Sequence, residues 1–187
     1  MKTLIIKFIF ACAFAFIIFF GGHYTMKATS NDKFCVVCHE WMDPMVKSYA
    51  QSTHGGVNSA GFKADCTSCH LPHDSYVKYV FKKGFNGISE FTYMIFNDAN
   101  DFDWQSNRKN RERFVYDSGC MSCHQKILDI NNTNPNINDM HKLYADSDNN
   151  NKKLFCVSCH KNVGHKNLGK ILYEIKNPPV NDWDDEK

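Results

Sequence analysis

The chain opens with a long apolar stretch that ends where a mixed polar sequence begins. Between Leu4 and Met26 the only charged residue is Lys7. About 20 apolar residues in a helix can cross a bilayer, and a lysine near one end can extend its ammonium to the headgroups. We therefore predict a membrane anchor over residues 1–27 and a separate domain over residues 28–187.

A cleaved signal peptide is the alternative interpretation of this stretch. Such a peptide needs small residues spaced around a cleavage site soon after the apolar run. The sequence at that point reads Gly22-His23-Tyr24-Thr25-Met26-Lys27 and offers no such site. We therefore expect the anchor to be retained.

A second apolar pattern has the period of an amphipathic helix. Its apolar residues recur at steps of three or four, at Val77, Val80, Phe81, Phe85, Ile88, Phe91 and Ile95. Gly84 and Gly87 weaken the pattern without ending it. The apolar face of this helix can pack inside the domain or lie in the membrane–water interface, and the pattern alone allows both.

Two segments have the composition of irregular structure. In residues 129–153, eight of 25 residues are Asn and Pro135 is among them, which predicts a loop. Residues 177–187 contain Pro178-Pro179 and an acidic run, which predicts a mobile tail. The expected fold class is mainly α with long loops.

The charged residues nearly balance, because 22 Lys and Arg stand against 20 Asp and Glu. A net charge of +2 is no signature of a protein that binds a polyanion. We therefore expect no nucleic-acid partner.

One five-residue motif, Cys-x-x-Cys-His, occurs four times and uses eight of the nine cysteines. In this motif two thiols form thioethers to haem and the adjacent His ligates the iron. A bare Cys-x-x-Cys is also compatible with zinc or a redox dithiol, but the His after every pair favours haem. The sequence thus predicts four covalently bound haem c groups in a compact, haem-cored domain. The haem-attaching cysteines are Cys35, Cys38, Cys66, Cys69, Cys120, Cys123, Cys156 and Cys159.

Haem attachment of this kind requires an exported location, and this fixes the expected orientation. The N-terminus is expected in the cytoplasm, with a single pass through the inner membrane. The haem domain is then periplasmic. Lysines do not decide the orientation, because they occur on both sides of the apolar stretch.

A haem iron that only transfers electrons is six-coordinate, so four irons need four ligands beyond the motif histidines. The motif histidines are His39, His70, His124 and His160, and the histidines best placed as further ligands are His54, His141 and His165. His23 lies at the membrane boundary, and His73 follows His70 too closely to reach the other face of the same haem. For the remaining iron, a thioether from Met42 or Met45 is available after the first motif.

The arrangement resembles the NapC/NirT family of membrane-bound tetrahaem quinol dehydrogenases over nearly the whole chain. The resemblance rests on an anchor before four haem motifs and on local matches. These are Cys-His-Glu-Trp-Met-Asp-Pro-Met from Cys38, Ser-Thr-His-Gly from Ser52, Cys-His-Leu-Pro-His from Cys69, Met140-His141 and Gly164-His165. In detail the chain is most similar to the NrfH branch, the small subunits of cytochrome c nitrite reductase complexes.

The resemblance implies a set of site residues. In the family a nearby Met replaces the motif His at the first haem, which here implies Met42 with His39 as the alternative. That Met usually lies two residues after the motif His, where this chain has Trp41. The family's quinol site uses a Lys and an acid seven residues later, a spacing that Lys83 and Glu90 match, with Lys82 as a near alternative.

The resemblance also implies a function. The chain is expected to oxidise menaquinol at the membrane and to pass electrons to a pentahaem cytochrome c nitrite reductase. In such complexes a lysine of the partner completes one haem, which would free one of the three histidines assigned above. The alternatives are a NapC-like chain that feeds nitrate reductase or other periplasmic acceptors, and a tethered electron carrier without a quinol site.

The retained anchor leads to a direct test. Intact-mass measurement of the purified protein is expected to give the chain from residue 1 or 2 plus four haems. A mature protein that starts near residue 28 would show instead that the apolar stretch is a signal peptide.

Overall fold

The computed structural model describes residues 2–37, 42–98, 102–129, 131–147 and 153–178. Within these ranges the only regular elements are helices, and this confirms the expected mainly α class. In chain order they are α1 (Lys2–Ala28), α2 (Asp32–Cys35), α3 (Asp43–Ala50), η2 (Thr53–Gly55), α4 (Cys66–His70), α5 (Tyr76–Phe96), α6 (Trp104–Lys109), η4 (Arg111–Arg113), α7 (Asp117–Cys123), α8 (Pro135–Ser147), α9 (Cys156–Cys159) and α10 (Leu168–Lys176).

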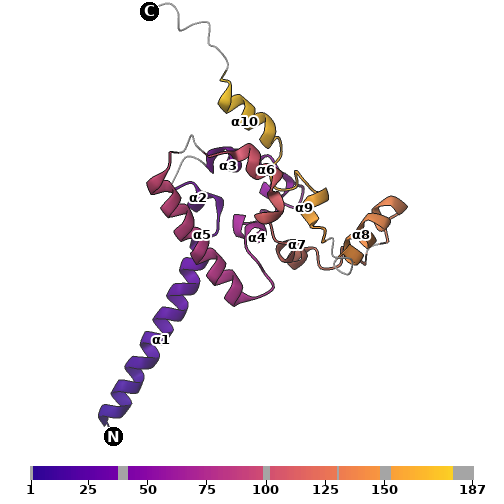
Figure 1. Ribbon diagram of the computed structural model, residues 1–187. Coiled ribbons are helices and arrows are strands. Elements are labelled where there is room, and N and C mark those ends of the chain that lie inside the picture. The colour runs from indigo at the N-terminus through magenta and orange to yellow at the C-terminus, as the bar shows by residue number, and fades with distance from the viewer. Residues whose placement is uncertain (1, 38–41, 99–101, 130, 148–152, 179–187) are drawn as a thin grey trace, which may run out of the picture.

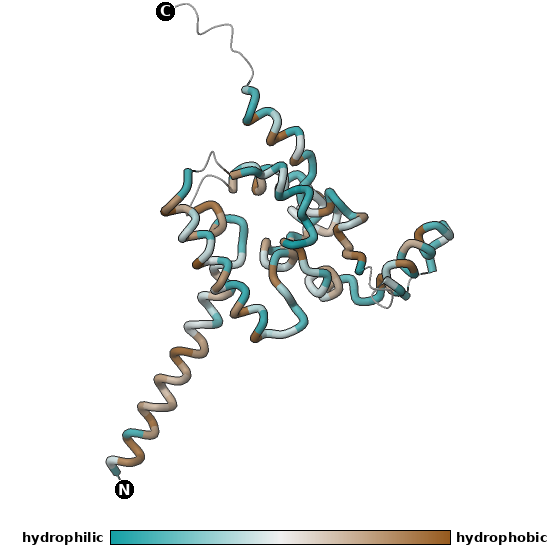
Figure 2. The backbone as a smooth tube through the Cα atoms, viewed as in Figure 1, coloured by the Kyte–Doolittle hydropathy of each residue, from teal (hydrophilic) through white to brown (hydrophobic). Residues whose placement is uncertain are grey.

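Helix α1 is a single rod that projects from the body of the molecule and packs against none of it along most of its length (Figure 1). Its most apolar 18-residue window has a mean hydropathy of 2.6 and no buried residue. Figure 2 shows this apolar character along the rod. By length and composition the helix can cross a membrane. Just beyond its C-terminal end, Ser30 Oγ donates a hydrogen bond to the carbonyl oxygen of Met26 at 2.5 Å.

Helix α5 confirms the amphipathic helix that the sequence predicts. It spans 21 residues, and none of them is buried. It lies beside the body end of α1 (Figure 1), where the Lys83 ammonium donates to Met26 O at 2.5 Å and to Ser30 Oγ at 2.8 Å. The large exposed apolar side chains of α5 are Tyr76, Val77, Phe81, Phe85, Ile88, Phe91, Ile95 and Phe96.

The body is made of short helices that surround a small protein core. Helix α10 packs on α3 and α6, α4 packs on α7, and α9 packs on η4. The hydrophobic residues buried among the described part of the chain are Tyr49, Ala64, Leu71, Val157, Leu168 and Leu172. A domain of this size buries many more apolar side chains when protein alone fills its interior.

The loop predicted over residues 129–153 is wrong for its central part, because α8 occupies 135–147. The asparagines that suggested a loop start the helix. Asn134 Oδ1 accepts from the backbone N–H of Asn136 at 3.0 Å, and Pro135 occupies the first helical position, where a missing N–H costs nothing. The helix extends from the body at one side, and its far end is away from α1 (Figure 1).

The predicted acidic tail falls almost entirely outside the described residues, which end at Pro178. The chain before it is helical up to Lys176 in α10, and Asn177 closes that helix with its N–H on Tyr173 O at 2.9 Å.

Two haem-motif helices meet closely at a glycine. Gly119, on α7, is buried, and a Cβ there would lie 2.1 Å from the carbonyl oxygen of Ser68 on α4. The Tyr116 N–H also donates to Cys69 O at 2.9 Å. The second and third motifs are thereby held in backbone contact.

Gly119→Ala is therefore expected to push α4 and α7 apart. The added methyl should lower the free energy of unfolding by about 1–3 kcal/mol, the usual cost of an overpacked contact. Denaturant unfolding of the haem-loaded protein measures this. The control is Gly87→Ala on α5, where a Cβ meets nothing within 4 Å, and equal destabilisation by both variants would contradict the close-contact argument.

Candidate haem-binding site

The motif cysteines lie on or beside single helical turns. Helix α4 spans Cys66–His70, α7 ends at Cys123 and α9 spans Cys156–Cys159. Residues three apart in a helix share a face, so each such turn presents both thiols of its motif to one side. None of the seven motif cysteines that the structure describes forms a disulfide. Cys38 and His39 of the first motif lie outside the described residues.

Each of the three described motif histidines faces one histidine from outside its own motif. The ring centroids are 6.1 Å apart for His70 and His165, and 6.1 Å apart for His124 and His54. The third pair is His160 and His141, at 6.3 Å. These partners are the three extra histidines that the sequence analysis selected, and the structure joins each to a particular motif.

This separation suits two ligands of one metal ion. Two imidazoles that bind from opposite sides, with metal–nitrogen bonds of about 2 Å, place their ring centres roughly 6 Å apart. Each pair can therefore hold one haem iron between its rings.

Hydrogen bonds at Nδ1 orient several of these rings. His70 Nδ1 lies 2.9 Å from Phe114 O, His54 Nδ1 lies 3.3 Å from Val163 O, and His165 Nδ1 lies 3.1 Å from Met45 O. A carbonyl can only accept, so each Nδ1 carries the proton and Nε2 is left with a lone pair for a metal.

His73 has the opposite arrangement. Its Nε2 lies 3.0 Å from the carbonyl oxygen of Thr67, and its ring packs edge-on against Tyr79 at 5.5 Å. The Nε2 nitrogen of His73, which would have to reach a metal, is therefore engaged by the backbone.

Burial favours the neutral form of two of the imidazoles. It lowers the pKa of His70, and it lowers the pKa of His165 to about 4, with a smaller contribution from His70 itself. A lowered pKa keeps both rings unprotonated at neutral pH, which is the form that binds metal.

The thiols reveal which motifs are neighbours. A hydrogen bond with Cys66 is the main cause that lowers the pKa of Cys35, and a hydrogen bond with Cys156 lowers that of Cys120 to about 7. Burial raises the pKa of Cys69 to about 11, and the charge of Cys120 adds to it. The first motif thus adjoins the second, the second adjoins the third and the third adjoins the fourth.

These residues fit haem c as the bound group. The donor set offers paired thiols, a histidine beside each described pair and a second histidine facing it. The few buried apolar side chains leave the interior to a large apolar group. The described residues would hold three such groups through both axial ligands, and the first motif would hold another.

The structure places Met45 on α3 and Met42 directly before it. Met42 is half-buried and stands at the N-terminal boundary of α3. Met45 lies one turn later, and its carbonyl oxygen is the acceptor of His165 Nδ1.

The proposed quinol residues lie on α5 close to the first motif. The charge of Lys83 lowers the pKa of Cys35 in addition to the Cys66 hydrogen bond, and the charge of Glu90 opposes it. Burial in turn lowers the pKa of Lys83. Lys82 points elsewhere, with its ammonium 5.7 Å from the centre of the Phe85 ring.

Two residues that shape the site were not identified individually from the sequence. Gly55 follows the ligand candidate His54, and a Cβ there would lie 1.9 Å from Tyr49 O. Ser48 is fully buried, and its hydroxyl lies 2.9 Å from His165 Nδ1. The Ser-Thr-His-Gly match indicated Gly55, whereas no sequence feature indicated Ser48.

Paired thiols on single turns, histidines that face each other across a metal-sized gap and an apolar helix of membrane-spanning length define a c-type cytochrome with an N-terminal anchor helix. The chain belongs to the NapC/NirT cytochrome c family, whose N-terminal-region model matches residues 1–170. Its general role is therefore electron transfer through haem c.

Individual relatives agree with this membership. The chain is 31% identical to the tetraheme c-type cytochrome CymA of Shewanella oneidensis, over 79% of this chain and 82% of that protein. It is 26% identical to the cytochrome c-type protein NapC of Escherichia coli, over 80% of this chain and 76% of NapC. It is also 28% identical to the denitrification system component NirT of Stutzerimonas stutzeri, over 80% and 75%. No solved structure matches the chain.

Proposed function

We propose that the protein oxidises menaquinol at the periplasmic face of the inner membrane and passes the electrons through four haems to a periplasmic reductase. The observation that carries this proposal is the hydrogen bonding of Lys83 on α5 to the end of α1, which places Lys83 and Glu90 within electrostatic reach of Cys35 of the first motif. An acid and a base beside the first haem, on a helix tied to the anchor, suit quinol chemistry. Each quinol becomes a quinone and gives up two protons and two electrons.

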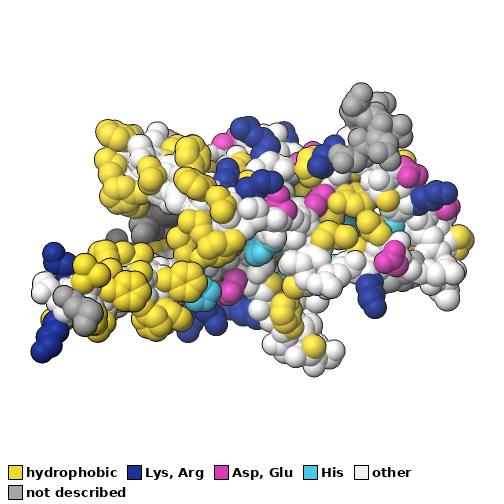
Figure 3. Space-filling view, turned by 90° about the horizontal axis from the view of Figure 1, so that it is seen from below, with side chains coloured by type: hydrophobic (Ala, Val, Ile, Leu, Met, Phe, Trp, Pro, Cys, Tyr) yellow, Lys and Arg dark blue, Asp and Glu magenta, His cyan; other side chains and the backbone are white. Residues whose placement is uncertain are grey.

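The proposed topology has residues 1–27 as a single-pass anchor with its N-terminus in the cytoplasm, and residues 28–187 in the periplasm. The exposed apolar side chains of α1 and α5 support it. Seen from the side to which α1 projects, hydrophobic side chains gather over one end of the molecule (Figure 3). That end would lie on the bilayer, with α5 in the interface.

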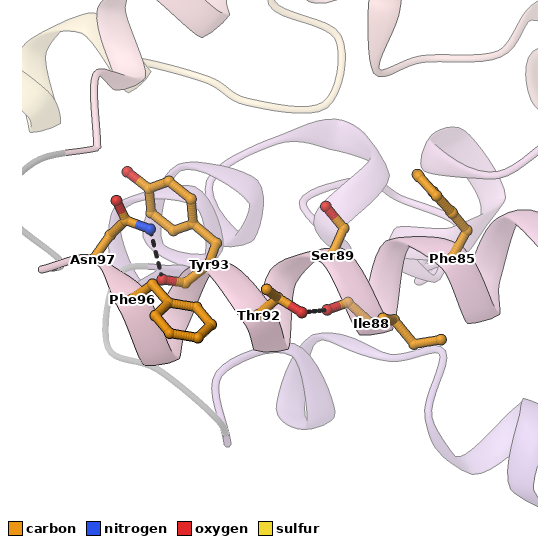
Figure 4. A pocket seen from close by; sticks show the side chains of 7 residues that line it. All are labelled: Phe85, Ile88, Ser89, Thr92, Tyr93, Phe96 and Asn97. Carbon is orange, nitrogen blue, oxygen red and sulfur yellow. Dashed lines mark hydrogen bonds between the residues drawn. The ribbon is translucent and has the colours of Figure 1, made fainter.

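At the quinol site, Glu90 takes a proton from a quinol hydroxyl and Lys83 donates a hydrogen bond to a quinone oxygen. The seven-residue spacing supports this pairing, because it returns to nearly the same face of a helix. An adjoining cavity of about 400 Å³ on α5 offers apolar surface for the hydrocarbon part of the quinol (Figure 4). It is lined by Phe85, Ile88, Ser89, Thr92, Tyr93, Phe96 and Asn97.

We propose that three haems are held by the pairs His70 and His165, His124 and His54, and His160 and His141. The first haem is held by Cys35 and Cys38, with Met42 as an iron ligand. Bound haem supplies one-electron redox chemistry, and the chain sets the spacing, the ligands and the burial that tune it. The neighbouring thiols support electron flow in motif order, from the first motif near α5 to the fourth beside α8.

The sequence resemblance points to a pentahaem nitrite reductase as the electron acceptor. One observation favours the alternative of a NapC-like chain that serves another periplasmic acceptor. All three extra histidines already face a motif histidine within this chain. No iron of these three pairs then needs a lysine from a partner protein.

The ligand pairs predict a spectroscopic pattern in the purified chain. His54→Ala, His141→Ala and His165→Ala are each expected to convert one low-spin haem to high spin, because each removes one axial ligand. Met42→Ala should alter the spectrum and potential of the first haem only. Electron paramagnetic resonance and optical titration measure both effects.

His73→Ala is the matched control and should leave every haem unchanged. A change in Met45→Ala in place of Met42→Ala would move the first-haem ligand to the other sulfur. An open haem in the unaltered isolated chain would instead support completion by a partner lysine.

The quinol site predicts that Glu90→Gln slows quinol oxidation by roughly 10²-fold or more, the usual effect of losing a positioned base. The substitution keeps the shape of the side chain and removes its charge. Steady-state oxidation of a menaquinol analogue measures the rate, while reduction by dithionite is expected to reach all four haems as before.

Glu174→Gln, an exposed acid on α10, is the control and should keep the parent rate. Lys83→Ala should also slow the reaction, and a larger loss in Lys82→Ala would show that the neighbouring lysine binds the quinol. If Glu90→Gln and Lys83→Ala both oxidise quinol at the parent rate, α5 serves only in packing. That result would favour the tethered electron carrier without a quinol site.

A further inference from the structure

Ser48 is the most deeply buried side chain of the body, and it lies against a proposed iron ligand. Its relative exposure is 0%. Its hydroxyl lies 2.9 Å from His165 Nδ1, and its backbone carbonyl accepts from the Lys166 N–H at 3.2 Å. Both the side chain and the backbone of Ser48 therefore fix the segment that presents His165.

The hydrogen-bond directions around Ser48 are determined by one carbonyl. Ser48 Oγ donates to Met45 O at 2.9 Å, so the hydroxyl hydrogen is committed to that carbonyl. The oxygen of Ser48 can then only accept from His165 Nδ1. Nδ1 also lies 3.1 Å from Met45 O, and thus its N–H faces two acceptors at once.

We propose that Ser48 is a positioning residue that holds the His165 ring toward the second haem and lowers the reduction potential of that haem. This inference rests on the proposed ligation of the second iron by His70 and His165. Two acceptors on Nδ1–H increase electron density on the ring and strengthen Nε2 as a donor. A stronger donor stabilises oxidised iron relative to reduced iron.

The same helix links the first two haems. Helix α3 begins beside Met42, proposed for the first iron, and carries Met45 and Ser48 at the ligand of the second. It is eight residues long and spans about 12 Å.

The test is a redox titration of the haem-loaded full chain with Ser48→Ala, followed optically and by electron paramagnetic resonance. The variant removes one of the two acceptors and leaves Met45 O. We expect all four haems to keep the spin states of the parent protein. The reduction potential of one haem should shift upward, and its g values should change. Ser48→Thr keeps the hydroxyl and should restore the parent potential.

Ser147→Ala is the matched control, because Ser147 is also buried and, among the described residues, hydrogen-bonds to the backbone at Tyr144 and Leu154. Parent potentials and g values in Ser48→Ala, or the same shift in Ser147→Ala, would overturn the proposal. If Ser48→Ala does not load haem, Ser48→Cys, a weaker acceptor of similar size, carries the same expectation. The redox titration needs no quinol, so a failure of the Glu90→Gln prediction leaves this proposal intact. If His165→Ala leaves every haem unchanged, the assignment of His165 as an iron ligand is wrong.

Discussion

The arrangement of this protein depends on one requirement: an imidazole from one part of the chain must face an imidazole from another at about the distance that a single metal ion spans. His70 meets His165 and His124 meets His54 in this way, although roughly 70 or more residues separate each pair in sequence. Close backbone contacts make this possible. Gly55 allows the turn at His54 to approach Tyr49, and Gly119 allows two motif helices to touch. Few apolar side chains are buried in the described part of the chain, because the haems that these histidines would hold take up the interior.

The second organising contact joins the anchor to the body. Lys83 donates to the last turns of α1 while it lies within electrostatic reach of Cys35. The same side chain thereby holds α5 against the end of α1 and lies near the first motif. A lipid-soluble substrate reaches a haem domain only where such a domain touches the bilayer, and the apolar surfaces of α1 and α5 meet at that end (Figure 3). Under the proposed function, Lys83 combines this structural contact with the binding of quinol.

Beyond the membrane, the order of the motifs in space follows their order in sequence. The hydrogen bonds of Cys35 with Cys66 and of Cys120 with Cys156, and the electrostatic interaction of Cys69 with Cys120, give a continuous series. Burial keeps His70 and His165 neutral and available as ligands. Membership of the NapC/NirT cytochrome c family is consistent with such a series. The three described histidine pairs each form within this one chain, so none of them requires a ligand from the acceptor.

The sequence by itself determined the local features of this protein. Four copies of one motif identify haem c, one unbroken apolar run forms α1, and three- and four-residue apolar steps form α5. Composition misjudged α8, because asparagine disfavours the interior of a helix but also caps its start, and Asn134 does so here. Only the tertiary structure decided which histidine faces which motif and brought Ser48 against His165. These contacts join segments far apart in the chain, and such contacts depend on how all the helices pack together, which no local sequence pattern records.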